Sequence, residues 1–165
     1  MKSLSLLLIG LLCTCAFAKI KKINDNDVIP YAKPLENVTA KDQLCLAYSI
    51  YREAGNLKPS AQYAVGQVHI NRLNEGSWGK SLCKVVFAKA QFSWTLDKRI
   101  IGWTKKQEFQ FMTIAEGLIW GLRVKGLNSE RVLHYHANYV NPKWGKKNKV
   151  VAMAGPHIFY KDIAH

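Results

Sequence analysis

The spacing of apolar and polar residues predicts a helical body in the first three quarters of the chain. One helix opens at the capping-box pattern Thr39–Asp42 and ends at Gly55, and a second runs from Pro59 to about Asn74. A short helix is expected over 81–88 and a long one over 105–125. The side chains expected to face the core are Leu44, Ala47, Tyr48 and Tyr51 in the first helix, Ala61, Ala64, Val65, Val68 and Leu73 in the second, and Phe109, Met112, Ala115, Ile119 and Leu122 in the long one.

The pattern changes after Gly126. Residues 132–136 and 157–160 have the composition and length of two short strands. Residues 19–38 are polar and contain Pro30 and Pro34, so we expect an extended lead-in with little core of its own. The chain is therefore predicted to be α+β, with a helical body followed by a small C-terminal β portion in a single domain over 39–165.

The first eighteen residues have the pattern of a signal peptide. Lys2 provides the positive charge, 4–12 is almost wholly apolar, and Ala16-Phe17-Ala18 is a cleavage pattern that makes Lys19 the expected mature start. The apolar run is shorter than a membrane span needs. We therefore expect a protein exported to the periplasm or secreted, without stable membrane insertion after cleavage.

Two of the four cysteines lie beyond the predicted signal peptide. An exported pair such as Cys45 and Cys83 is expected to form a disulfide. The alternative is a cysteine nucleophile, but neither residue has an acid–base partner nearby in the sequence.

The chain is strongly basic, with 24 Lys and Arg against 11 Asp and Glu. A formal charge of +13, lowered by one when Lys2 is removed, favours polyanionic partners such as cell-wall polymer, nucleic acid or acidic lipid. Residues 143–149 hold Trp144 and four lysines, and could serve a non-catalytic wall- or nucleic-acid-binding module. A solvated loop that helps to hold an anionic wall is the preferred interpretation.

Elimination among the acids leaves Glu53 as the candidate for chemistry. It lies near the end of the first predicted helix, where the helix dipole and burial would both raise its pKa, as a general acid requires. Its position alone is equally compatible with a solvent-exposed helix residue. Asp97 could reach the same site. The other acids lie in the lead-in, at a cap, on the long helix, in turns or near the C-terminus: Asp25, Asp27, Glu36, Asp42, Glu75, Glu108, Glu116, Glu130 and Asp162.

One strong acid and one doubtful second acid favour a particular reaction. Glycoside hydrolysis normally uses two carboxylates. A lytic transglycosylase needs one, because the acid protonates the glycosidic oxygen and the sugar's own hydroxyl then closes onto the anomeric carbon. The cluster Gln91, Phe92, Ser93 and Trp94 is the expected glycan groove, although one of its two aromatic residues is expected to be core. The pair Asn71-Arg72 is assigned to the end of a helix rather than to ligand binding.

Histidines suggest a competing hypothesis. His134 and His136 would share one face of a strand, and together with His157 they could hold zinc in an amidase or peptidase. There is no HExxH pattern, so we prefer histidines that line the groove or hold backbone groups, with no metal and no cofactor.

Several motifs in register resemble the SleB-type cell-wall hydrolases, over about 43–161. The matching segments are Ile50–Ala54, Ala64-Val65, Val68, Asn71-Arg72, Cys83–Phe87, Gln91–Trp94, His134–Ala137 and Gly155–Tyr160. The resemblance implies a lysozyme-like helical core, cleavage of the glycan strand of peptidoglycan by a lytic transglycosylase, and a catalytic role for Glu53.

The chain departs from that family's pattern in two places. The family often continues Glu-Ala-Arg-Gly-Glu, where this chain has Gly55, Asn56 and Leu57, so a second glutamate is missing. An acid is also often found where Asn138 stands. Tyr135 and His157 complete the expected substrate-binding set, and the expected protein is a monomer that binds peptidoglycan and no nucleic acid.

Overall fold

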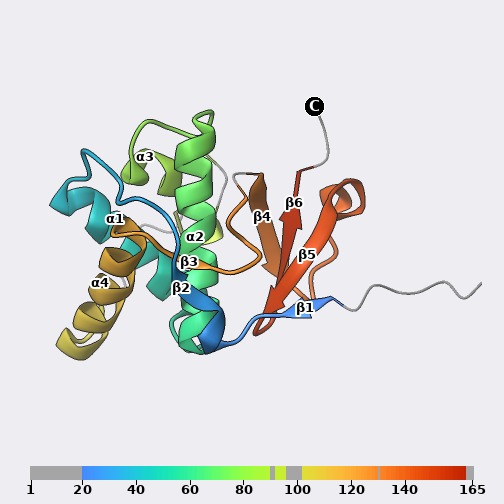
Figure 1. Cartoon of the computed structure of the whole chain (residues 1–165), viewed down its shortest axis with the longest axis horizontal. Coiled ribbons are helices and arrows are strands. Elements are labelled where there is room, and N and C mark those ends of the chain that lie inside the picture. Colours follow the sequence, from blue (N-terminus) through green and yellow to red (C-terminus); the bar gives the residue numbers. More distant parts are fainter. Residues whose placement is uncertain (1–19, 90–91, 96–101, 130, 163–165) are drawn as a thin grey trace, which may run out of the picture.

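The computed structural model describes residues 20–89, 92–95, 102–129 and 131–162. A helical group and a sheet stand side by side, with α2 between them (Figure 1). The helices are α1 (Ala40–Ala54), α2 (Pro59–Glu75), α3 (Leu82–Val86) and α4 (Lys105–Ile119), with short 3-10 turns η1 (Asp25–Asp27), η2 (Ser93–Thr95) and η3 (Lys143–Lys147). The strands are β1 (Lys21–Lys22), β2 (Val28–Pro30), β3 (Leu122–Val124), β4 (Val132–Ala137), β5 (Lys149–Ala154) and β6 (His157–Lys161). The predicted α+β class is confirmed.

Local signals set the ends of the helices. The capping box predicted at Thr39 and Asp42 is present at the start of α1, and a second one joins Thr104 and Gln107 at the start of α4. Pro59 occupies the first turn of α2, where its missing N–H costs nothing. Gly76 ends α2 in the left-handed conformation, which explains why a glycine follows that helix.

Helix α2 is the centre of the molecule. It packs against α1 and α4 on one side and against the sheet on the other, and nearly all of its residues from Ser60 to Arg72 are buried. At Gly66 an added Cβ would overlap the side chains of Ile50 and Leu118, so glycine is what allows α1, α2 and α4 to approach closely. One apolar cluster fills the space among these helices, and another lies between α2 and the sheet.

The main sheet has the order β1-β5-β6-β4. Strand β6 pairs antiparallel with β4 and with β5, and β1 lies parallel to β5 at the edge (Figure 1). Strands β2 and β3 form a separate antiparallel pair. The two predicted C-terminal strands are present, whereas β5 was missed because Lys149–Ala154 carries no turn or alternation signal strong enough to mark it.

The lead-in supplies β1 and β2 and buries Ile23 in the apolar cluster between α2 and the sheet. The predicted end of the long helix is wrong. The long helix ends at Ile119, and Leu122–Val124 becomes β3 after Gly121, whose φ of 100° stops the helix. The partner strand β2, about ninety residues earlier, provides the hydrogen bonds that favour this strand over further helix.

The buried stripes of α1 and α4 are rotated from those predicted. Leu44 and Phe109 are exposed, the latter by 76%. Ala47 and Ala115 are buried as predicted. The side chains buried beside them that were not predicted are Leu46, Ile50 and Ala54 in α1 and Phe111, Ile114 and Leu118 in α4. Several apolar positions on each helix have helical spacing, and only the neighbouring helices decide which of them face inward.

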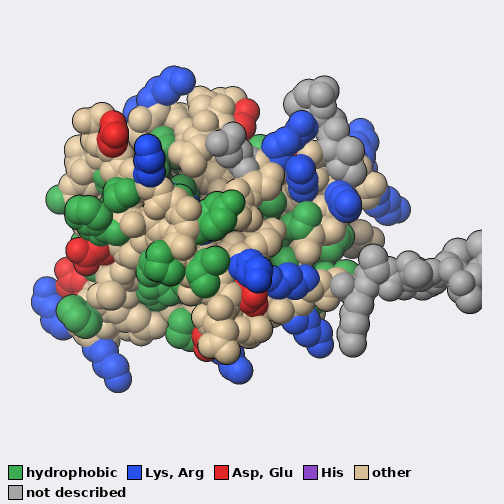
Figure 2. Space-filling model, viewed as in Figure 1, with side chains coloured by type: hydrophobic (Ala, Val, Ile, Leu, Met, Phe, Trp, Pro, Cys, Tyr) green, Lys and Arg blue, Asp and Glu red, His purple; other side chains and the backbone are tan. Residues whose placement is uncertain are grey.

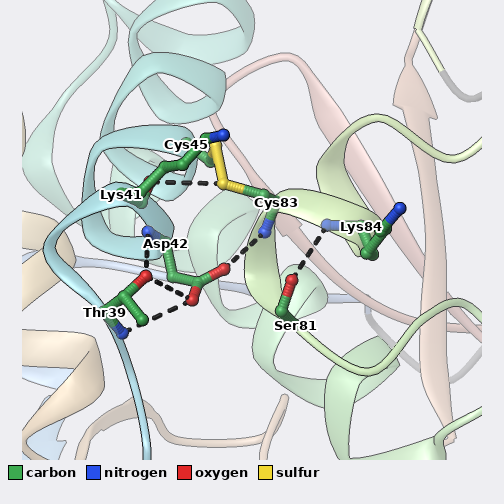
Figure 3. Close-up of a disulfide and its surroundings, with 7 residues drawn as sticks. All are labelled: Thr39, Lys41, Asp42, Cys45, Ser81, Cys83 and Lys84. Carbon is green, nitrogen blue, oxygen red and sulfur yellow. Dashed lines mark hydrogen bonds between the residues drawn. A yellow bond between two sulfur atoms is a disulfide. The ribbon is translucent and has the colours of Figure 1, made fainter.

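The predicted Cys45–Cys83 disulfide is present and joins α1 to α3 (Figure 3). Beside it, Asp42 belongs to the capping box of α1, in which its backbone N–H donates to Oγ1 of Thr39. The Asp42 carboxylate also accepts a 3.0 Å hydrogen bond from the backbone N–H of Cys83. Burial opposes ionisation of Asp42, but the hydrogen bonds from Cys83 and Thr39 outweigh it and hold the pKa of this carboxyl below its usual range. The disulfide and the Asp42 carboxylate therefore fasten the same two helices together.

Within the described ranges, no helix is long and apolar enough to cross a membrane. On the face drawn in Figure 2, Lys and Arg side chains are more prominent than Asp and Glu, in line with the basic composition of the chain.

Candidate active site

Glu53 lies in the last turn of α1, at the junction between the helices and the sheet. Its Oε1 accepts a 2.6 Å hydrogen bond from the indole Nε1 of Trp94, and its Oε2 accepts a 3.2 Å hydrogen bond from the hydroxyl of Tyr135. Burial raises the pKa of the Glu53 carboxyl above its usual value. The hydrogen bonds from Trp94 and Tyr135 and the charges of Arg52 and Arg72 oppose this rise without cancelling it.

A cavity of about 320 Å³ opens at Glu53. It is lined by residues of α1, α2, β4 and β6, by the residue before η2 and by one in the turn after β4: Arg52, Glu53, Arg72, Phe92, Tyr135, His136, Ala137, Tyr139 and His157. Glu53 is the one carboxylate among these described lining residues. Asp97, the second acid considered from the sequence, lies outside the described residues.

The predicted glycan groove is brought to Glu53 in part. Phe92 and Trp94 stack with 5.5 Å between ring centroids and 16° between ring planes. Phe92 is 8% exposed and Trp94 is more accessible, which agrees with the expectation that one of the two is core. Ser93 lies between Phe92 and Trp94 in the sequence and begins η2. Gln91 lies outside the described residues.

The two predicted contributors from the sheet also reach the cavity. Tyr135 on β4 bonds to Glu53, and His157 on β6 lines the cavity and packs edge-on against Tyr135 at 5.2 Å. Burial raises the pKa of Tyr135 well above its usual value, so its hydroxyl keeps its proton and remains a donor. Burial lowers the pKa of His157.

The three histidines of the zinc hypothesis do not form one site, although His136 and His157 both line the cavity. His134 and His136 lie on one face of β4, where both contact Trp144, whereas His157 packs against Tyr135 on the other face. His136 is held by the hydroxyl of Tyr160 at 2.7 Å, and His134 lies 3.5 Å from Asp162. Among the residues that the structure describes, no group of three or more His, Cys, Asp and Glu is arranged to hold a metal ion.

Arg72 is the residue that sequence reasoning missed. Its backbone carbonyl helps to end α2, as predicted for Asn71-Arg72, but its side chain reaches the cavity. Arg72 is 5% exposed as a residue. Its Nε donates to the carbonyl of Leu133, its guanidinium lies over the Trp78 ring at 4.3 Å, and its Nη1 has no hydrogen-bond partner. Burial lowers the pKa of Arg72 to about 10, so it remains charged at neutral pH.

Asn71, the neighbour of Arg72 on α2, connects that helix to the sheet by hydrogen bonds. Asn71 Nδ2 donates to the carbonyls of Leu127 and Val132, each at 3.0 Å, and so fixes the start of β4. The carbonyl of Leu133, also on β4, accepts the hydrogen bond from Arg72. Tyr135 lies two residues further along the same strand. The pair Asn71-Arg72 therefore positions the strand that brings a donor to Glu53.

A buried histidine supports the aromatic floor of the cavity. His69 Nε2 lies 2.9 Å from the hydroxyl of Ser49, and the ring packs edge-on against Phe92 at 5.5 Å. Burial lowers the pKa of His69 to about 3, so the ring is neutral at physiological pH. Its role is to hold Phe92 in place beneath Trp94.

Comparison with known proteins identifies the family. The profile of the cell wall hydrolase family matches residues 58–160, and the chain belongs to that family. The match begins after Glu53, so it assigns no role to that residue. No curated protein sequence matches the chain.

Among solved structures, the fold is similar to that of the catalytic domain of the Bacillus cereus SleB protein. The TM-score is 0.63 at 20% sequence identity, with 79% of this chain and 98% of that chain covered. The predicted resemblance to SleB-type cell-wall hydrolases is confirmed.

Proposed function

We propose that this protein cleaves the glycan strand of peptidoglycan as a lytic transglycosylase, with Glu53 as the general acid and then the general base. The observation that carries the proposal is the Glu53 carboxyl itself. It lies at a cavity, its pKa is raised by burial, and two donors from distant parts of the chain fix its orientation. The cell-wall hydrolase family supplies the polymer class.

The donors on Glu53 indicate which oxygen carries the transferable proton. An indole N–H can only donate, so Trp94 holds Oε1 as an acceptor. The proton therefore belongs to Oε2, whose contact with Tyr135 is the longer one at 3.2 Å. A phenol hydroxyl can donate or accept, so Tyr135 is able to follow both protonation states of Glu53.

The reaction needs no second carboxylate. Glu53 gives its proton to the bridging oxygen as the bond from that oxygen to the anomeric carbon breaks. The carboxylate then takes the proton of the C6 hydroxyl of the same sugar, while that hydroxyl oxygen bonds to the anomeric carbon. Glu53 ends protonated, no water is consumed, and the new sugar end is an internal anhydro ring.

Arg72 stabilises the intermediate state of Glu53 in this scheme. Its positive charge favours the carboxylate that remains after the proton has left, and the charge of Glu53 in turn raises the pKa of Arg72. Because the guanidinium is buried and held by Leu133, it is oriented before the reaction begins. Its Nη1 is buried and has no hydrogen-bond partner, so the guanidinium acts on the Glu53 site through its charge.

The products and the metal requirement can be tested together. Purified peptidoglycan is digested by protein that has been dialysed at length against EDTA, and the fragments are analysed by mass spectrometry. We expect undiminished cleavage and fragments that are lighter by one water than hydrolysis products. Reducing-end products would contradict the transglycosylase step, and activity lost to EDTA and restored by zinc would favour the amidase or peptidase alternative.

Removing a donor from Glu53 should change the pH dependence in a defined direction. The Tyr135 hydroxyl stabilises the ionised carboxyl, so Tyr135→Phe should raise the pKa of Glu53 further. A general acid works while protonated, and activity is lost as pH rises through its pKa. The alkaline limb of the kcat/KM profile should therefore move to higher pH.

The matched control for this variant is Tyr31→Phe, which removes the same hydroxyl from an exposed residue outside the cavity. Its profile should overlay that of the wild-type protein. A limb that stays in place or moves to lower pH in Tyr135→Phe would show that Glu53 is not the acid that this limb reports.

We also propose that the protein works outside the cytoplasm, since cell-wall polymer lies there. The working form begins at Lys19 after removal of the signal peptide, and residues 39–165 form its catalytic domain, to which the lead-in adds β1 and β2. The excess of positive charge would draw it to an anionic wall. Neither the monomeric state nor the absence of nucleic-acid binding is needed for the reaction, and both stay predictions.

A further inference from the structure

A second cavity adjoins the Glu53 site. It lies between the end of α1 and the start of α4, has a volume of about 320 Å³, and is lined by Tyr51, Arg52, Gly55, Asn56 and Gln107. Arg52 lines this cavity and the Glu53 cavity as well. A polymer bound at Glu53 would therefore bring its neighbouring groups to this second cavity.

The chain departs from the pattern it resembles at Gly55, which lines this cavity, and at Leu57, which does not. Gly55 stands where that pattern has arginine, and an added Cβ at this position would overlap the carbonyl oxygen of Tyr51. Leu57 stands where the pattern has glutamate, and it packs against the apolar cluster between α2 and the sheet. Arg52 is left as the one charged residue among the described residues that line the cavity.

The Arg52 guanidinium is oriented by aromatic rings. It lies 5.4 Å from the ring centroid of Trp94 and 5.9 Å from that of Tyr48, and Nη1 donates to the Tyr48 hydroxyl at 3.3 Å. In the described part of the chain, no carboxylate lies within ion-pair distance of it. A planar cation held in this way, with donors to spare, suits a carboxylate ligand.

We propose that this second cavity binds a carboxylate of the muramoyl part of the substrate, and that Arg52 is its ligand. The proposal rests on the proposed function for the choice of polymer. The sugar rings of a peptidoglycan strand are uncharged, and their negative charge is borne by the lactyl group or by the peptide stem attached to it. In this proposal Arg52 recognises the lactyl or peptide-stem carboxylate of the substrate, while Glu53 acts on the glycosidic bond between its sugars.

The test measures equilibrium binding of disaccharide–peptide fragments by calorimetry. These fragments contain no internal muramoyl linkage to cleave, so binding is measured whether or not the protein is a transglycosylase. Three forms are compared: the native fragment, the same fragment with its stem carboxylates converted to amides, and the disaccharide with a free lactyl carboxylate and no peptide. The proteins are the wild type, Arg52→Gln, Arg52→Lys and the control Lys105→Ala.

We expect the wild-type protein to bind at least one carboxylate-bearing form about tenfold more tightly than the amidated form, and Arg52→Gln to bind all forms equally. Arg52→Lys keeps the charge and should keep part of the preference. Lys105→Ala removes one positive charge close to Gln107 without entering the cavity, and should keep all of it. A preference confined to the native fragment places the carboxylate on the stem, and one shared by the peptide-free disaccharide places it on the lactyl group.

A preference that survives in Arg52→Gln, or is absent from the wild type and from Arg52→Lys, would overturn the proposal. A preference lost equally in Lys105→Ala would also overturn it, because general attraction by a basic protein would then explain the result. If Arg52 only supported Trp94, Arg52→Gln would weaken the binding of all three forms alike and leave the ratio of their affinities unchanged. Failure of the transglycosylase proposal appears separately, in the product analysis.

Discussion

Glu53→Gln should lower peptidoglycan cleavage by about two to four orders of magnitude, the range that a general acid contributes. The amide keeps the size and shape of the side chain. Its oxygen can still accept from Trp94, and its nitrogen can donate to the Tyr135 hydroxyl, so the geometry of the site is retained. What is lost is the transferable proton. The measurement is the initial rate of fragment release from purified peptidoglycan.

The substitution should not destabilise the fold at neutral pH. Because the pKa of Glu53 is raised in the folded protein, its ionisation costs stability as pH rises from the ordinary carboxyl range through the folded pKa. Below that range the cost is absent, and above the folded pKa it is fully present. Glutamine removes the cost, so Glu53→Gln should melt at or above the temperature of the wild type at pH 7.

The control is Glu116→Gln, which makes the same exchange at an exposed position of α4 and should leave the rate unchanged. A Glu53→Gln variant that releases fragments at near the wild-type rate would remove Glu53 from the mechanism. Asp97, in the stretch between Trp94 and α4, would then be the acid to test.

The double variant Cys45→Ser, Cys83→Ser should be much less stable to unfolding than the wild-type protein. The bond closes a loop with a sequence separation of 38, for which loop entropy gives about 4 kcal/mol. In a domain of this size that corresponds to a fall in Tm of roughly ten degrees. Wild-type protein melted in the presence of a reductant should match the double variant, because both lack the same bond.

The oxidation state is measured independently by intact mass. Protein purified from an oxidising compartment should be about 2 Da lighter than the all-thiol chain, since each disulfide removes two hydrogens. Two free thiols by titration of unreduced protein would contradict the bond. The Asp42 contact to the Cys83 N–H would still join α1 to α3, so the double variant should fold at low temperature.

Elements whose signals are local could be predicted from the amino-acid sequence alone. The Thr39–Asp42 capping box, Pro59 and Gly76 are each encoded within a few residues, and the structure begins or ends its helices there. The disulfide was predictable because only two cysteines follow the predicted signal peptide. Glu53 emerged by elimination among few acids, and family motifs supplied the polymer class.

Tertiary structure decided what depends on distant partners. Trp94 and Tyr135 meet Glu53 from 41 and 82 residues away, and no periodicity of α1 encodes those contacts. Leu122–Val124 left the helix for a strand because β2 was there to pair with it. Arg72 and Arg52 acquired their places because α2 and α1 are packed against the sheet and α4. Spacing along the chain specifies which face of a helix or strand a residue occupies. Tertiary packing decides which other residues it contacts. Those contacts set the pKa of an acid such as Glu53 and decide which groups lie near a cation such as Arg52.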